Sequence, residues 1–226
     1  RPASSVVTLT ELASVPANHK VQLDLKTEHL DHAVVETLDA WKKGYGNTGG
    51  SGVSLGALSG TGVLSGAGNA PGSSIYTIGA KGINTTFSGS IENGNSGNTS
   101  IIKAGAGIQT LNGVLTYSGN TTVSNGVLAL SGATVALTNT PTISVKSGAA
   151  LDVSGTTSST LTLGQFKAQT LSGAGTVNGS VVASNDFAVT IVPGDSIGNL
   201  TITNALQLAA GTVINMELNR TNAGAT

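Results

Sequence analysis

The stretch VLTYSGNTTVSNGVLALSG, residues 114–132, decides the fold. Apolar and polar side chains alternate in 114–118 and again in 127–131, and Gly119 and Gly132 follow these two segments. Alternation over about four to eight residues is typical of a β-strand with one buried face. Glycine permits the left-handed backbone that a tight corner requires. The stretch therefore predicts short strands that end at glycine corners.

Imperfect copies of the pattern continue along the chain, at residues 150–155, 169–173, 200–204 and 206–211. Internal repetition of short strands is typical of a solenoid, in which each strand pairs with its equivalent one rung away, about 4.8 Å off. With roughly 20–25 residues per rung, the region 53–226 would form on the order of eight rungs and a rod about 40 Å long. The sequence thus predicts an all-β, right-handed parallel β-solenoid, or β-helix.

Composition supports a narrow aliphatic core. The 226 residues include 32 Gly and no Cys; 38% are hydrophobic, but only 3% are aromatic and 9% charged. Disordered chains are poor in hydrophobic residues, so this chain is expected to bury a core. Sandwich or jelly-roll strands, the competing interpretation, usually bring aromatics to a thicker core. The net charge of −1 gives no basic surface for nucleic acid, and no apolar run approaches the roughly 20 residues of a membrane helix.

The composition changes near Gly44. Segment 1–43 holds every His and the only Trp, and its pattern predicts two strands and a helix over 30–43, a cap or assembly element for the solenoid. The glycine-rich residues 44–52 predict a joint. Trp41 on the helix and Tyr45 in the joint could contact a glycan or a partner, although packing of Trp41 onto the rod is the alternative.

One metal-like cluster also falls in this segment. His29 and His32 accompany Glu28 and Asp31 at helical spacing, but a solvated helix face is the simpler interpretation. We therefore expect no metal site and no cofactor.

Four longer motifs follow one another along the chain: KAGAGIQTL at 103–111, LTYSGNTTVSNGVL at 115–128, LSGAGTVNGSV at 171–181 and PGDSIGNLTI at 193–202. Their content and order resemble a known bacterial family, the autotransporter-associated β-strand repeat. The resemblance, which runs from about Ser54 to Glu217, implies a parallel β-helix on a large secreted or outer-membrane-associated bacterial protein. It further implies use as a stalk, spacer or adhesive passenger, with an extracellular or outer-membrane surface location.

Three functions follow as hypotheses. The first is a non-catalytic stalk or fibre subunit, whose open solenoid ends could pair head to tail with other copies to form a homo-oligomer or filament. The second is an adhesin or a module that binds surface polysaccharide through ladders of Thr, Asn and Ser. The third is a β-helix enzyme that degrades polysaccharide.

The sequence argues against the enzyme. After the joint, carboxylates occur singly along the chain, at Glu92, Asp152, Asp186, Asp195 and Glu217. Gly194-Asp195-Ser196 copies an esterase nucleophile motif, but no histidine follows His32 to take the serine proton. A turn is therefore expected at this motif, and no catalytic residue is assigned.

Overall fold

The computed structural model describes residues 52–66, 73–95, 97–133 and 135–217. The predicted cap 1–43 and residues 44–51 of the joint lie outside these residues, so the two strands and the helix expected there stay predictions. Within the described ranges the chain forms nineteen β-strands and no α-helix. Accordingly, those ranges contain no helix that is long and apolar enough to cross a membrane.

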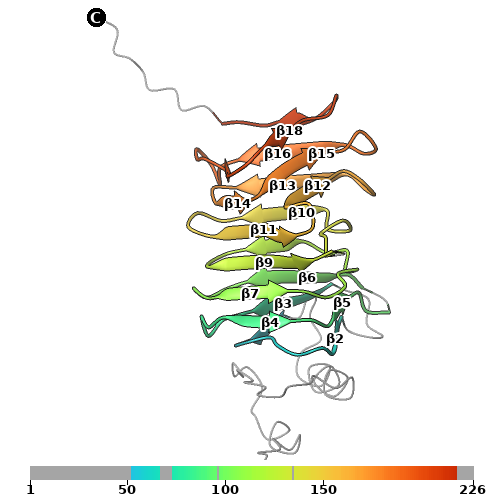
Figure 1. Ribbon diagram of the computed structural model, residues 1–226, viewed down its shortest axis with the longest axis vertical. Helices are drawn as coiled ribbons and strands as arrows, with labels where there is room; N and C mark the ends of the chain where they lie inside the picture. Colours follow the sequence, from blue (N-terminus) through green and yellow to red (C-terminus); the bar gives the residue numbers. More distant parts are fainter. Residues whose placement is uncertain (1–51, 67–72, 96, 134, 218–226) are drawn as a thin grey trace, which may run out of the picture.

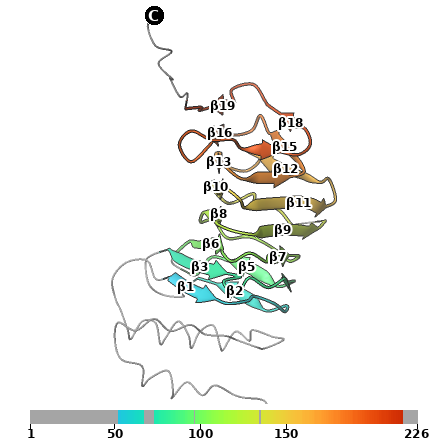
Figure 2. The same cartoon turned by 90° about the vertical axis from the view of Figure 1, so that its left-hand side faces the viewer.

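The strands stack across the long axis of the molecule, as Figures 1 and 2 show. Face A is one sheet of eight strands: β1 (Gly52–Leu55), β3 (Ser74–Ile78), β6 (Thr99–Lys103), β8 (Thr121–Val123), β10 (Thr142–Val145), β13 (Gln169–Gly173), β16 (Val189–Pro193) and β19 (Val213–Ile214). Face B has six strands: β4 (Thr85–Phe87), β7 (Ile108–Leu111), β9 (Val127–Gly132), β11 (Ala150–Thr156), β14 (Thr176–Asn178) and β17 (Thr201–Ile202). Face C consists of two separate sheets: β2 (Val63–Ser65) with β5 (Ser90–Glu92), and β12 (Thr160–Leu163), β15 (Ser180–Ala183) and β18 (Leu206–Gln207).

Each strand of face A pairs in parallel with its equivalent one winding further along the chain. The eight strands thus define seven complete windings, which we call rungs 1 to 7. Register partners lie 20 residues apart between Ile101 and Thr121, and 28 apart between Ile143 and Leu171. The predicted parallel solenoid is confirmed, and the sandwich alternative is wrong because every pair of neighbouring strands is parallel.

Aliphatic side chains stack in columns inside the rod. On face B, Leu128 pairs in register with Leu151, which pairs with Val177, and all three are 0% exposed. Burying one such side chain stabilises a protein by about 1.5–3 kcal/mol. Asp152, next in sequence to Leu151, lies on the opposite, outer surface of the strand, as the alternation predicted. The repeated column is what makes a chain with so few aromatics foldable.

Face C is interrupted in the middle of the rod. β12 pairs with β15 on one side only, and no backbone hydrogen bond among the described residues joins it to 135–138 of the preceding rung. The strand before it, β11, changes register between Asp152 and Gly155 where it pairs with β9. This irregularity falls in the 28-residue rung, and it opens the side wall of the solenoid.

Candidate functional site

Trp41 and Tyr45, the predicted partner or glycan contacts, lie outside the described residues, as do His29 and His32. Within the described ranges, no group of three or more His, Cys, Asp or Glu side chains could hold a metal ion. The contact role of Trp41 and Tyr45 therefore stays a prediction.

Three of the aspartates after the joint each have a polar partner. Asp152 accepts hydrogen bonds from the backbone N–H and the hydroxyl of Ser154, at 2.9 and 2.6 Å. The hydroxyl of Ser184 donates to Asp186 at 2.6 Å. Asp195 forms an ion pair with Lys146 at 2.6 Å. These contacts fasten corners and loops.

The Gly194-Asp195-Ser196 motif lies in a bend after β16, as predicted. Gly194 has φ 96°, a left-handed backbone that suits glycine. The hydroxyl of Ser196 donates to the Glu217 carboxylate at 3.2 Å, an exposed contact. A nucleophilic serine needs a positioned base, and a solvent-exposed carboxylate at this distance is a weak one.

A lysine lies inside the core, which the sequence analysis did not predict. Lys103 is 0% exposed and occupies the face A column between Ile78 and Val123. Its ammonium group donates to three backbone carbonyls: Ala104 O at 2.8 Å, Gly105 O at 2.9 Å and Asn125 O at 3.1 Å. Burial lowers the pKa of Lys103 below its usual 10.5 because water no longer stabilises the charged form.

Gly105 and Gly126, which lie in two successive motifs, let two corners stack closely. At Gly126 φ is 63°, and a Cβ there would lie 2.5 Å from the carbonyl oxygen of Gly105 in the rung below. A side chain at this position would force the two corners apart, and the carbonyls that Lys103 binds would separate. The lysine and the glycines thus form one structural unit between rungs.

Two buried glutamines, Gln109 on face B and Gln169 on face A, also bind backbone groups. Gln109 donates to Leu58 O at 3.0 Å and accepts from the Thr85 hydroxyl at 2.8 Å. Gln169 donates to the carbonyls of Leu137 and Thr140 at 2.8 and 2.7 Å. Each amide binds backbone carbonyls of an earlier part of the winding that no strand pairing reaches.

Tyr117 completes this set of buried polar groups. Its hydroxyl lies 2.6 Å from the Thr121 hydroxyl, which lies 3.3 Å from that of Thr140. Burial raises the pKa of Tyr117 to about 12. These hydroxyl contacts link three successive segments, which contain Tyr117, Thr121 and Thr140.

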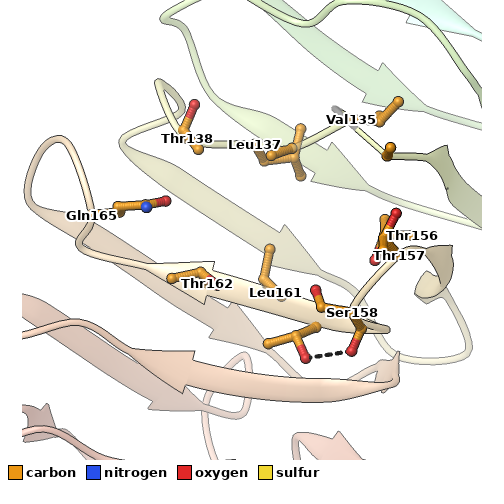
Figure 3. A pocket seen from close by; sticks show the side chains of 12 residues that line it. Val135, Leu137, Thr138, Thr156, Thr157, Ser158, Leu161, Thr162 and Gln165 are labelled. Atoms are coloured by element: carbon orange, nitrogen blue, oxygen red, sulfur yellow. Dashed lines mark hydrogen bonds between the residues drawn. The ribbon is translucent and has the colours of Figure 1, made fainter.

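The interruption in face C forms a cleft of about 190 Å³, shown in Figure 3. One wall is formed by Ala133 and residues 135–138 and the other by β12, with the loop after β11 at one end and Gln165 at the other. Its lining residues are uncharged, a mixture of hydroxyl and aliphatic side chains: Ala133, Val135, Ala136, Leu137, Thr138, Thr156, Thr157, Ser158, Thr160, Leu161, Thr162 and Gln165. This cleft is the binding-site candidate on the side of the rod.

The last described rung differs from those before it because its apolar side chains are exposed. Ile214 is 39% exposed, whereas Ile191, its register partner in β16, is 2% exposed. Leu206 in β18 is 42% exposed, whereas its partner Val181 is 0% exposed. β17, β18 and β19 each end their sheet and pair on one side only.

These features define a class of protein, the parallel β-solenoid built from repeated short strands with glycine corners. Residues 101–130, from β6 to β9, match the family described as passenger-associated-transport-repeat. This match and the β-solenoid together support an autotransporter passenger-type repeat protein, and the resemblance noted in the sequence is confirmed. In the same comparisons no curated protein and no solved structure matches the chain.

Proposed function

We propose that this chain is a rigid, non-catalytic stalk within a secreted or surface-exposed bacterial passenger protein. The observation that supports the proposal is the continuous eight-stranded ladder of face A, backed by core columns that are almost fully buried. Such a ladder transmits load along its axis and holds attached modules at a fixed distance. The family match supports surface exposure, because passenger repeats are found in exported proteins.

Small-angle X-ray scattering of the full chain tests the stalk. Seven rungs at about 4.8 Å each give a folded rod about 34 Å long. The scattering should show this rod-like unit, and hydrogen exchange should show slow amides throughout the strands of face A. Scattering typical of an expanded chain, or fast exchange in the middle of the ladder, contradicts a rigid stalk.

Catalysis is tested separately. The full chain is incubated with neutral and acidic polysaccharides, and new chain ends are measured. We expect none. Reproducible product release, abolished by denaturing the protein, would overturn the non-catalytic assignment and favour the β-helix enzyme.

The exposed final rung supports a second proposal, that copies associate through this end into a head-to-tail filament. Unpaired strand edges pair readily with other strands, and the exposed apolar residues Leu206 and Ile214 would be buried by such a contact. The occupant that fits is the first rung of another copy, which would continue the same parallel ladder.

Ile214→Lys tests the filament because a lysine on an edge strand opposes pairing. Ile108→Lys is the matched control: Ile108 is 38% exposed, almost the same as Ile214 at 39%, but lies on face B away from the end. Sedimentation at rising concentration should show association of the wild type and of the control, and none for Ile214→Lys. Monomers of the wild type, or equal association of all three proteins, would exclude the filament.

A further inference from the structure

The cleft on face C presents backbone groups as well as side chains. Ser159 O and Leu163 O accept hydrogen bonds from Ser180 N of β15 and from Ser184 N, directly after β15, at 2.9 and 2.8 Å. In a parallel ladder the alternate residues turn their backbone groups to the opposite side of the strand. The N–H and C=O groups of Thr160 and Thr162 therefore face the cleft, where no described residue pairs with them.

Unused side-chain groups surround this edge. The hydroxyls of Thr138, Thr157 and Thr162 and the amide of Gln165 form no hydrogen bond with the described residues. Figure 3 shows them distributed around the cleft, so a small molecule within it would meet donors and acceptors from several directions. Buried polar groups of a ligand need such partners to offset the loss of water.

The rest of the lining restricts the ligand. No charged residue lines the cleft, so an anion or cation would lose hydration without gaining a counter-charge. Leu137 and Leu161 supply an apolar floor. A sugar ring matches this combination, because its hydroxyls point outward from the rim and its C–H groups form apolar faces.

Size separates a sugar from an extended peptide. Pockets for drug-sized ligands have volumes of roughly 300–1,000 Å³. The cleft has about 190 Å³, which suits one ring rather than a bound strand. β12 is four residues long, so it offers a peptide only a short pairing edge. The interior column remains closed behind the floor, since Leu161 is 3% and Leu137 is 2% exposed.

From this geometry we propose that the cleft between 135–138 and β12 is a binding subsite for one neutral sugar unit of a polysaccharide. The unit lies against Leu137 and Leu161 and exchanges hydrogen bonds with the edge of β12 and with the threonine hydroxyls. The subsite adds a lateral contact to the stalk and does not depend on catalysis or on filament formation.

Nuclear magnetic resonance titration of the full, ¹⁵N-labelled chain tests the subsite. The probes are a β-1,4-linked glucose trimer, an α-1,4-linked glucose trimer, an N-acetylglucosamine trimer and a galacturonic acid trimer. At least one neutral trimer should shift the amides of 156–162 and 135–138 in a saturable manner, and the acidic trimer should not. Shifts confined to other regions, no saturable shift with any neutral trimer, or preference for the acidic trimer would overturn the proposal.

Variants separate specific binding from a general effect of hydroxyls on the surface. Thr162→Val and Gln165→Ala each remove hydrogen-bonding groups from the cleft, and each should weaken binding roughly three- to tenfold. Thr190→Val is the control, since Thr190 lies on the outer surface of β16 on face A. Equal weakening by the control, or full binding by both cleft variants with unchanged urea midpoints, would contradict this site. Saturable binding of an unrelated extended peptide at the same amides, without sugar binding, would instead assign the edge to strand addition.

Discussion

Rung 3 and rung 5 occupy equivalent positions in the solenoid but fill them with different chemistry. In the face A column, rung 3 has Lys103 where rung 5 has Val145. In the face B column, rung 3 has Gln109 where rung 5 has Leu151, with Leu128 between them. All of these side chains are 0% exposed. The same interior therefore accepts a cation, an amide or an aliphatic group.

The difference teaches what a polar core residue contributes to a solenoid. Lys103 and Gln109 bind backbone carbonyls at corners, where strand pairing cannot reach them. Beside β12 the buried amide of Gln169 binds Gly164 N and Leu137 O, but no described residue binds the backbone edge of Thr160 and Thr162, which stays open as the cleft. Polar core residues thus satisfy the backbone groups within their reach, and the edge that none of them reaches leaves a gap that a ligand can use.

The largest expected effect comes from placing a charge where the column has no counter-charge. Leu128→Asp should destabilise the fold by about 4 kcal/mol, because its carboxylate would be buried between Gln109 and Leu151 without a counter-charge. Asp152→Ala, on the outer surface of the adjacent rung, should cost less than about 1 kcal/mol. Urea unfolding measures both. A reversed ranking would mean that the strand register is wrong.

Lys103→Met makes rung 3 resemble rung 5. Methionine keeps the volume and apolar stem but leaves the carbonyls of Ala104, Gly105 and Asn125 without their donor. We expect a loss of about 2 kcal/mol in the free energy of unfolding. Val145→Met in rung 5 is the control for the change in packing. Stabilisation by Lys103→Met would show that desolvation of the ammonium group outweighs its three hydrogen bonds.

Gln109→Leu applies the same exchange to face B. Leucine continues the column formed by Leu128 and Leu151, so apolar packing offsets part of the lost hydrogen bonds to Leu58 and Thr85. The net cost should be about 1 kcal/mol. Thermal or urea melts can resolve this, and a neutral result would mean that the corner carbonyls find other partners.

Many of the strands could be predicted from the sequence, but the buried polar side chains could not. The alternation in 127–132 predicted β9 and the burial of Leu128. Lys103 was visible only as the first residue of a motif, and lysine is almost never fully buried. The signal was the position of Lys103 in the alternation of β6, because Thr99, Ile101 and Lys103 alternate with residues that point outward. The cleft left no comparable signal, since it results from the register shift in β11 and from a long rung.

The two buried ionisable groups near rung 3 should give stability opposite dependences on pH. The pKa of Lys103 is lowered in the folded state, so the unfolded chain binds more protons between that lowered pKa and 10.5, and stability rises with pH in this window. The pKa of Tyr117 is raised to about 12 from 10.0, so the folded state binds more protons, and its contribution is present below pH 10 and lost as pH rises toward 12.

Matched variants isolate each effect. Relative to Lys103→Met, the wild type should gain stability as pH rises from the lowered pKa of Lys103 toward 10.5. Relative to Tyr117→Phe, it should lose stability above pH 10. Urea unfolding at each pH measures these differences, in which the other titrating groups cancel. A flat difference for Lys103→Met would mean that the three carbonyls fully replace water around the ammonium group. Burial in rung 3 would then not destabilise the charged form of Lys103.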